Sequence, residues 1–330
     1  RVAIASNTCL DWVLADQAIM LAGGATTTVY ASTGDHDVAY ILGDSNTRFV
    51  FAEDQSQVDK IALHKDELNI EKIILFTGAG DGDWVITLDE LRALGQTYLQ
   101  QNPAAVKERA QAVTGDCLAT LIYTSGTTGK PKGVELTHNN WTYEAAFMDS
   151  LGIMNPQDVQ FLWLPLAHSF GKVLLLAGLQ VGFVTAVDGR VPKIVDNLPI
   201  VQPTFMAAVP RIFEKVYSKV AQTALADGGA KAKIFTWAFS FGNQMSEKKL
   251  SGQSLSGMEN FKLNLANKLV YSKIQERLGG HMRYMISGSA ALSKDIALWF
   301  YTAGLPILEG YGLTETSAAT CVMRPDRIKF

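Results

Sequence analysis

The sequence predicts an α/β protein in which mostly parallel sheets are covered by helices. Short runs rich in Val, Ile and Phe recur along the chain, and segments with the apolar spacing of helices separate most of them. Strands that are apolar along their whole length are typical of parallel sheets buried on both faces. Because the chain has 330 residues, we predict two packed lobes of one large domain, residues 1–155 and residues 156–330.

Composition narrows the class of protein. Apolar residues make up 48% of the chain and charged residues 18%, which excludes extensive disorder. The net charge of -3 gives no indication that nucleic acid or an anionic membrane is the main partner. Cys9, Cys117 and Cys321 lack any CxxC spacing, so we interpret them as reduced thiols of a cytoplasmic protein, with Cys9 and Cys117 packed in apolar surroundings. The longest apolar region, residues 173–187, is interrupted by polar residues and glycines and falls short of the ~20 residues of a spanning helix.

The first half of the chain alternates between the two patterns. Thr87 and Glu90 have the spacing of a capping box at the start of one helix. Residues 78–84 have two glycines at the spacing of a dinucleotide loop, but their two acidic residues repel phosphate, so we interpret them as a surface loop. Residues 102–109 form a polar, partly helical connector. We expect strands at 2–5, 27–31, 48–52, 72–76 and 118–123, and helices at 11–22, 54–68 and 88–99.

The most informative stretch is residues 121–133, Leu-Ile-Tyr-Thr-Ser-Gly-Thr-Thr-Gly-Lys-Pro-Lys-Gly, in which an apolar strand runs into a polar loop. Its glycines permit a tight turn, and its hydroxyls, amides and two ammonium groups add donors with little bulk. This combination is typical of a cradle for phosphates. Because Lys130 is followed by Pro131 rather than Ser or Thr, the loop is not a Walker A loop. It follows the carboxyl end of a strand, where open α/β sheets usually bind ligands.

Residues 123–133 resemble the phosphate-loop signature of the adenylate-forming superfamily, which comprises acyl-CoA synthetases, adenylation domains of non-ribosomal peptide synthetases and firefly-type luciferases. The resemblance implies that this loop holds the β- and γ-phosphates of ATP, with Lys132 as a loop or surface charge. The residues that it assigns to the phosphates are Thr124, Ser125, Gly126, Thr127, Thr128, Gly129 and Lys130.

The second half begins with an expected helix at 138–151, after the loop. An apolar strand from residue 161 then ends at Pro165 and His168. A small-residue turn at 287–292 leaves amides free and gives room for a flat ring. Further strands are expected at 181–187, 204–209, 282–287 and after Pro306, and helices at 173–180, 211–225, 231–249, 261–278 and 294–301.

Two segments of this half complete the expected nucleotide site. In the superfamily the turn at 287–292 lies along the adenine, and an aromatic side chain between two glycines, such as Tyr311, can lie flat against a base. Thr314 can donate a hydrogen bond to the α-phosphate. The residues that the resemblance assigns to the nucleotide here are Gly288, Ser289, Ala290, Tyr311, Gly312 and Thr314.

Two side chains of this half are expected to act on the substrate or on a metal. A lone histidine after an apolar strand is most often a structural residue, but the resemblance sets His168 near the acyl carboxylate and the phosphates. Glu315 offers hard oxygen ligands suited to Mg²⁺. Together with Lys130 and Thr314, these are the expected catalytic residues.

The resemblance implies a ligase that uses ATP, Mg²⁺ and coenzyme A. A carboxylate attacks the α-phosphorus of ATP directly, so no nucleophile from the protein is required, and a thiol then displaces AMP from the acyl-adenylate. Residues 203–215 resemble the long-chain fatty acyl-CoA synthetase branch, which makes a long-chain fatty acid the expected substrate. The resemblance also implies that the small C-terminal domain, with its hinge and its lysine for adenylation, is absent from this chain.

Other functions stay open at this point. A fatty acyl-AMP ligase would pass the adenylate to a carrier protein, and a nucleotide-binding module would not catalyse a reaction. A phosphotransferase is disfavoured, because no Ser or Thr follows Lys130 and no set of kinase motifs is present. Peripheral association with the inner face of a membrane is left open, as is the oligomeric state, for which a homodimer is one option.

Overall fold

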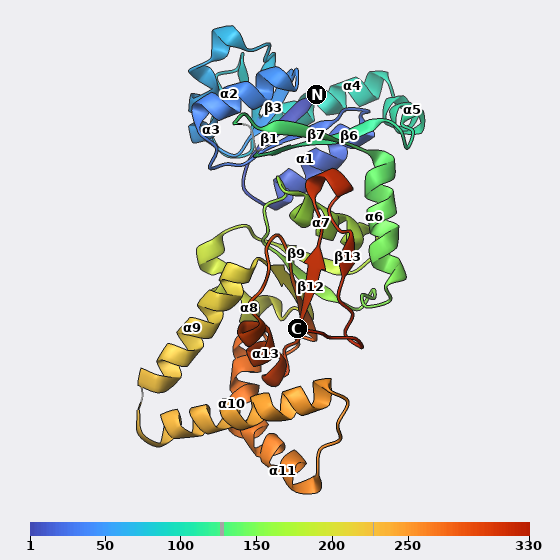
Figure 1. The fold of residues 1–330 in the computed structure, drawn as a ribbon. Coiled ribbons are helices and arrows are strands. Elements are labelled where there is room, and N and C mark those ends of the chain that lie inside the picture. Colours follow the sequence, from blue (N-terminus) through green and yellow to red (C-terminus); the bar gives the residue numbers. More distant parts are fainter. Residues whose placement is uncertain (126–128, 227) are drawn as a thin grey trace.

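The computed structural model describes residues 1–125, 129–226 and 228–330 (Figure 1). Within these ranges the strands form one sheet of seven strands and one of six. Every strand pair there is parallel except one at the edge of each sheet. The expected α/β fold with mostly parallel, helix-covered sheets is therefore confirmed.

The strands of the first sheet all lie within the first 137 residues. Its edge strand β7 (Lys132–Thr137) runs antiparallel to β6 (Leu118–Thr124). The strands expected at residues 2–5, 27–31, 48–52, 72–76 and 118–123 are confirmed. Beyond β6 and β7, the strands in spatial order are β5 (Val85–Thr87), β4 (Lys72–Leu75), β3 (Phe49–Ala52), β1 (Val2–Ala5) and β2 (Thr26–Val29). The helices are α1 (Leu10–Leu21), α2 (Asp35–Asp44), α3 (Gln55–Ala62), α4 (Leu88–Gln101), α5 (Ala105–Ala112) and a 3₁₀ turn at Lys65–Glu67.

Three elements of the first half were not expected from the sequence: β5, β7 and α2. The helix expected at residues 138–151 is confirmed as α6 (His138–Ser150), and β7 lies between it and the phosphate loop. The polar edge strand β7 lacks the continuous apolar pattern of the buried strands. The capping box at Thr87 and Glu90 is confirmed, since the Glu90 carboxylate accepts from the Thr87 N–H at 2.6 Å.

The second sheet lies below the first in Figure 1, and α6 (His138–Ser150) runs alongside both. Its antiparallel edge strand is β13 (Cys321–Val322), which pairs with β12 (Ile307–Tyr311). The remaining strands in spatial order are β11 (Tyr284–Ser287), β10 (Phe205–Ala208), β8 (Val159–Leu162) and β9 (Val184–Val187). Its helices are α7 (Ser169–Val181), α8 (Ile194–Val201) and α13 (Lys294–Thr302), with 3₁₀ turns at Val191–Lys193 and Thr314–Thr316.

A group of helices, which we name the helical arm (residues 210–277), extends from the second sheet at the end opposite to the first sheet (Figure 1). No helix in the described ranges is long and apolar enough to cross a lipid bilayer. The arm contains α9 (Pro210–Ala226), α10 (Gly229–Leu250), α11 (Gly257–Ala266), a π-helical turn (Asn267–Tyr271) and α12 (Ser272–Arg277).

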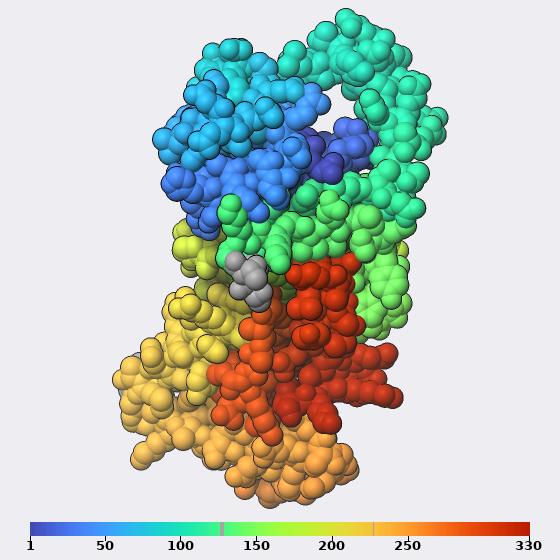
Figure 2. All heavy atoms as spheres, turned by 45° about the horizontal axis from the view of Figure 1, so that its top comes forward, coloured from blue at the N-terminus to red at the C-terminus, as the bar shows by residue number. Residues whose placement is uncertain are grey.

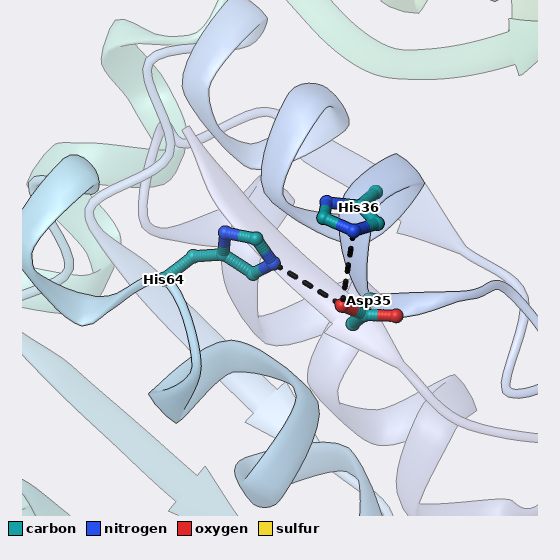
Figure 3. Close-up of side chains that lie close together, drawn as sticks. All are labelled: Asp35, His36 and His64. Atoms are coloured by element: carbon teal, nitrogen blue, oxygen red, sulfur yellow. Dashed lines mark hydrogen bonds and ion pairs between the residues drawn. The ribbon is translucent and has the colours of Figure 1, made fainter.

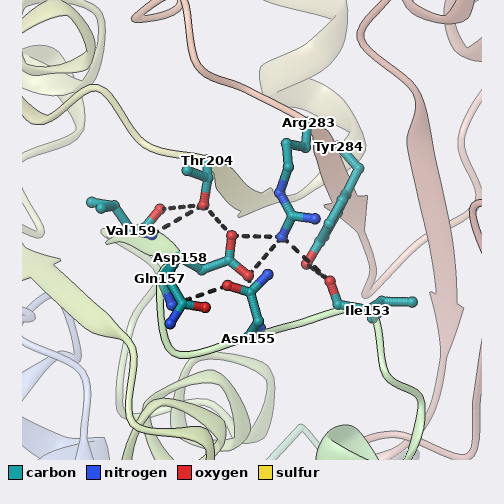
Figure 4. Close-up of polar contacts among 8 residues, drawn as sticks. All are labelled: Ile153, Asn155, Gln157, Asp158, Val159, Thr204, Arg283 and Tyr284. Carbon is teal, nitrogen blue, oxygen red and sulfur yellow. Dashed lines mark hydrogen bonds and ion pairs between the residues drawn. The ribbon is translucent and has the colours of Figure 1, made fainter.

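The amino ends of the second sheet's central strands are held by one buried carboxylate, Asp158 (Figure 4). Arg283 donates to its Oδ1 and Oδ2 at 2.5 and 2.6 Å, and the Thr204 hydroxyl donates to Oδ1 at 2.6 Å. The Tyr284 hydroxyl donates to the Ile153 carbonyl at 3.0 Å. Parallel sheets of α/β proteins usually bind ligands at the carboxyl ends of their strands. Because this network lies at the amino ends, we assign it a structural role.

The two sheets share the larger of two hydrophobic clusters, and the smaller one, which includes Val50 and Leu75, belongs to the first sheet alone. A single buried cluster contains Ile4 and Trp12 from the first sheet's side and Phe161, Val173 and Phe300 from the second. The expected division at residue 155 falls in the connection from α6 to β8. The division into two lobes of one domain remains a prediction.

The expected packing of two cysteines in apolar surroundings is confirmed for Cys9 and wrong for Cys117. Cys9 is half-buried and packs against the shared core, whereas Cys117 is exposed. The Thr114 hydroxyl and N–H lie 3.4 Å from the Cys117 sulfur, and these hydrogen bonds lower the pKa of the thiol. The polar turn around Cys117 explains the error, because it precedes the buried part of β6.

Candidate active site

A cavity of about 270 Å³ lies at the carboxyl ends of β11 and β12, beside the start of α7. This is the edge of a parallel sheet at which α/β proteins usually bind ligands. In Figure 2, green atoms from the segment around β7 and red atoms from the last part of the chain lie next to each other on this face of the molecule. Eight of the predicted site residues line the cavity: Thr124, His168, Gly288, Ser289, Tyr311, Gly312, Thr314 and Glu315.

The other predicted residues do not line the cavity or lie outside the described ranges. Among the described residues of the loop, Thr124 lines the cavity, whereas Ser125, Gly129 and Lys130 do not, and neither does Ala290. The Lys130 ammonium lies 5.2 Å from the centre of the Tyr40 ring on α2. Their roles, and those of the undescribed Gly126, Thr127 and Thr128, remain predictions.

The phosphate loop connects two antiparallel strands as a hairpin. β6 and β7 pair in the register Tyr123↔Gly133 and Thr124↔Lys132. A Cβ at Gly133 would lie 3.0 Å from the Tyr123 ring, so a side chain there would crowd this pair. Lys132 is exposed, as expected for a surface charge. The hairpin places Thr124 at the cavity and lets the loop begin and end at the same edge of the sheet.

His168 is the N-cap of α7, and its ring is oriented by the first turn of that helix. Its Nδ1 accepts a hydrogen bond from the Phe170 N–H at 3.1 Å. In the neutral ring the proton is then on Nε2, which is left to donate. Burial lowers the pKa of His168, so the ring is neutral near pH 7. His168 can therefore act as a hydrogen-bond donor without carrying charge.

Thr8, in the loop after β1, and Thr28 of β2 hold the segment that precedes His168. The Thr8 hydroxyl donates to the Leu164 carbonyl at 2.7 Å and accepts from the Leu166 N–H at 3.0 Å. The Thr28 hydroxyl donates to the Ala167 carbonyl at 3.0 Å. These contacts join residues more than 130 positions apart in the chain, so no local sequence pattern could have predicted them.

The turn from Tyr311 to Ala319 depends on a close approach of its own backbone. A Cβ at Gly312 would lie 1.5 Å from the Ala318 carbonyl oxygen, so only glycine fits there. Ser317 and Ala318 have φ values of 68° and 102°, in the region that favours glycine. The surrounding contacts must therefore hold this turn in a strained conformation.

Glu144 of α6 supplies one of those contacts. It is buried, and its Oε2 accepts a hydrogen bond from the Ala319 N–H at 3.2 Å. Burial raises the pKa of Glu144 to about 7. Glu144 could not be recognised from the sequence, because a glutamate in a helix is usually exposed at the surface.

Thr314 and Glu315 occupy opposite environments although they are neighbours. Thr314 is buried, and its hydroxyl lies 3.2 Å from that of Ser169 at the start of α7. Glu315 is exposed at the rim of the cavity, where a carboxylate remains free for a hard cation. The residues present thus fit a Mg²⁺ ion at the mouth of the site.

A close contact between the turn after β11 and α7 shapes the side of the cavity that the sequence analysis predicted for the adenine. A Cβ at Gly288 would lie 3.1 Å from the Phe170 ring, which explains the small residue at this position. Ser289 has a φ of 69°. Phe170 and Gly288 therefore form a tight wall, and Tyr311 lines the same cavity.

One wall of the cavity is apolar, and its residues could not be predicted from the sequence. It combines side chains of α6, α7 and the second sheet: Met148, Val173, Leu174, Ile286 and Val322. The apolar run at residues 173–187 indicated a buried helix, but it did not indicate that Val173 and Leu174 line a cavity. Met148 belongs to the predicted first lobe, so the cavity draws on both lobes.

A second group of side chains that could bind a metal ion, Asp35, His36 and His64, lies outside the lining of this cavity (Figure 3). His64 Nε2 lies 3.3 Å from Asp35 Oδ2, and His36 Nε2 lies 3.9 Å from the same oxygen. The hydrogen bond with His64 lowers the pKa of Asp35. Imidazole nitrogens suit Zn²⁺ rather than Mg²⁺, so this cluster does not compete with Glu315 for the expected ion.

The fold and the position of the site together fit the class of nucleotide-binding α/β proteins. Two mostly parallel sheets bring Thr124, a small-residue turn and a Tyr-Gly-Leu-Thr-Glu segment to one cavity. The family model described as AMP-binding enzyme matches residues 1–329, and the chain belongs to that family.

Relatives and solved structures agree with this assignment. The chain is 32% identical to "Long-chain-fatty-acid--CoA ligase FadD15" of Mycobacterium tuberculosis, over all of this chain and 54% of the relative. It is 29% identical to "Fatty acyl-CoA synthetase A" of Dictyostelium discoideum, over 99% of this chain and 48% of the relative. The chain thus spans about half the length of the curated relatives it matches.

Among solved structures, a long-chain-fatty-acid-CoA ligase (FadD1) from Archaeoglobus fulgidus matches with a TM-score of 0.68 at 14% identity. The match covers 99% of this chain and 55% of that one. The anthranilate CoA ligase AuaEII matches with a TM-score of 0.67 at 16% identity, over 99% of this chain and 52% of that one. At these identities the likeness supports the fold.

Proposed function

We propose that this chain carries the adenylation site of a long-chain fatty acid–CoA ligase. The observation that supports it best is one cavity that joins Thr124, Thr314 and Glu315 to His168 and to an apolar wall. Such a cavity can hold a polar phosphate group at one end and an alkyl chain at the other. Long-chain fatty acid–CoA ligase is also the printed name of several relatives.

In the first half-reaction, a carboxylate oxygen of the fatty acid bonds to the α-phosphorus of ATP, and the bond from that phosphorus to the β-phosphate oxygen breaks. Pyrophosphate leaves, and the product is an acyl-adenylate. Thr314 is suited to donate to an α-phosphate oxygen, and the hydroxyls of the loop to the β- and γ-phosphates. His168 Nε2–H donates to the carboxylate or a phosphate oxygen, which reduces the repulsion between the two anions.

Glu315 would hold Mg²⁺ at the rim of the cavity. When bound, Mg²⁺ neutralises phosphate charge and orients the leaving pyrophosphate. Lys130 adds positive charge to the loop, and we propose that its ammonium group contacts the phosphates of bound ATP. Thr314 is held by Ser169, so its hydroxyl is already oriented before a nucleotide binds.

In the second half-reaction, the thiol of coenzyme A gives up its proton to solvent and its sulfur bonds to the acyl carbon. The bond from that carbon to the phosphate oxygen breaks, and AMP leaves with its electron pair. The apolar wall formed by α6, α7 and the second sheet would hold the first part of the alkyl chain. We further propose a cytoplasmic location with peripheral membrane association. The two exposed thiols, Cys117 and Cys321, are compatible with a reducing compartment.

The test is ATP–pyrophosphate exchange by the full-length protein with acids from acetate to palmitate, with and without coenzyme A. Exchange that increases with chain length, with acyl-CoA formed on adding coenzyme A, is the expected result. Exchange without any thioester would favour a fatty acyl-AMP ligase. Binding of ATP without exchange for any acid would contradict the proposed function and favour a non-catalytic module.

A further inference from the structure

The helical arm presents an apolar stripe to solvent. Met258, Phe261 and Leu265 of α11 and Leu269 of the following turn repeat at intervals of three and four residues, which places them on one face. Between 37% and 66% of each residue's surface is exposed. A run of large apolar side chains on one exposed helix face indicates an interaction site rather than scattered surface residues.

Lysines accompany this stripe, and the whole arm is basic. Lys262 and Lys268 are exposed on the same helical segment. Residues 210–277 contain eleven Lys and Arg and five Asp and Glu, a net charge of +6. Because the chain as a whole carries -3, the remaining residues carry -9. The positive charge is therefore concentrated on the part of the molecule farthest from the first sheet (Figure 1).

A second cavity in the arm has the character of a site for an anionic amphiphile. It measures about 350 Å³ and lies between α9, α10 and α12, with an apolar wall that includes Val220, Ile234 and Phe235. Lys273 and Arg277, which are exposed on α12, lie at its rim. Leu269 belongs to both this cavity and the apolar stripe, so the two features are continuous.

We propose that the helical arm docks on an anionic lipid bilayer through the stripe of α11. Phe261 and its apolar neighbours enter the boundary between headgroups and acyl chains, and the lysines contact lipid phosphates. Helices with large apolar side chains on one face beside lysines bind membranes in this way. Docking deepens the proposed function, because it holds the ligase at the phase in which long-chain acids concentrate.

The test is co-sedimentation of the full-length protein with phosphatidylcholine vesicles, with and without phosphatidylglycerol. We expect binding that requires phosphatidylglycerol and weakens with salt. Phe261→Glu combined with Leu265→Glu should lower the vesicle partition coefficient by about tenfold or more. The matched control is Leu94→Glu with Leu99→Glu, two residues of α4 with nearly the same exposed fractions, 61% and 41% against 66% and 41%.

Lys262→Gln with Lys268→Gln provides a second variant, in which every apolar side chain of the stripe is kept. It should reduce binding to phosphatidylglycerol vesicles and flatten the salt dependence. Equal binding by the wild type and both arm variants would overturn the proposal, as would a wild type that fails to bind. A change in sedimentation velocity or in unfolding midpoint confined to the arm variants would instead assign the stripe to a second copy or to another part of the chain. Because sedimentation needs no catalysis, these outcomes are independent of the exchange assay.

Discussion

Gly312 is the residue on which the geometry of the Tyr311–Ala319 turn depends most directly. Gly312→Ala forces a Cβ against the Ala318 carbonyl, which lies 1.5 Å from the position it would take. We expect a loss of about 1–3 kcal/mol in the free energy of unfolding and loss of pyrophosphate exchange. Gly310→Ala is the control, because its nearest neighbours would lie at 3.8 Å. Similar unfolding free energies for the two variants, measured in urea, would contradict the steric argument.

Glu315 is expected to matter for catalysis and not for the fold. It is exposed at the rim of the cavity, so Glu315→Ala should change the free energy of unfolding by less than about 0.5 kcal/mol. The same variant should abolish Mg²⁺-dependent exchange, because the carboxylate is the proposed metal ligand. Glu135→Ala on β7 removes another exposed carboxylate and should leave exchange intact. Near-normal exchange by the Glu315 variant would show that the metal assignment is wrong.

Glu144 should make stability depend on pH in an unusual direction. Its pKa is raised from 4.5 to about 7 in the folded protein, so the folded state holds its proton more tightly than the unfolded chain does. The contribution of this group is therefore neutral below pH 4.5 and becomes increasingly destabilising as the pH rises to about 7. Glu144→Gln keeps an oxygen for the Ala319 N–H and should raise the melting temperature at pH 8 but not at pH 4. A variant with the wild-type pH profile would rule out a buried, titrating Glu144.

Individual site residues differed in how far the sequence could predict them. The cavity residues among the predictions lie in short motifs whose residue types already suit nucleotide chemistry. Glu144, Thr8 and Thr28 lie in ordinary helix and strand patterns, and only tertiary contacts reveal their positions. The apolar wall was hidden for a similar reason, since Met148 and Ile286 look like any core residue until the cavity is known.

At the scale of elements, α1 and α7 are joined by a fully buried ion pair between the two sheets. Lys172 Nζ lies 2.6 Å from Asp16 Oδ1, and both side chains are wholly inaccessible. The same ammonium lies 5.6 Å from the ring centres of Trp12 and Trp141. The aromatic faces and the carboxylate thus provide the favourable contacts that offset removal of this charge from water.

Breaking this pair should cost more than replacing it. Lys172→Met leaves a buried carboxylate without its partner and should lower the free energy of unfolding by about 3–5 kcal/mol. Combining it with Asp16→Leu should recover most of that loss, because two apolar side chains can occupy the space. The measurement is a double-mutant cycle from denaturant unfolding. Additive effects of the two substitutions would mean that the ions do not stabilise each other.

The elements that the sequence predicted share one property, which is a strong apolar pattern. The buried parallel strands and the long helices of the arm appeared within a few residues of their expected bounds. β7 was missed because an edge strand with exposed Lys132 and Glu135 resembles a loop, and α2 because its short apolar pattern follows Gly34 and several polar residues. β13 has two residues and pairs through the backbone, so its side chains carry no signal.

At the scale of the whole molecule, the two sheets share the larger hydrophobic cluster, and this determines how the chain should unfold. Trp12 of α1 and Trp299 of α13 belong to the same buried cluster although they accompany different sheets. If residues 1–155 and 156–330 are lobes of one domain, neither can lose its packing without exposing the other's core. We therefore expect a single cooperative transition for the chain. Fluorescence of variants that retain only Trp12 or only Trp299 should give the same midpoint in urea, with far-ultraviolet circular dichroism as the global control. Two separated midpoints would mean that the halves are independent domains, and the cavity drawing on both would then lie at a movable boundary.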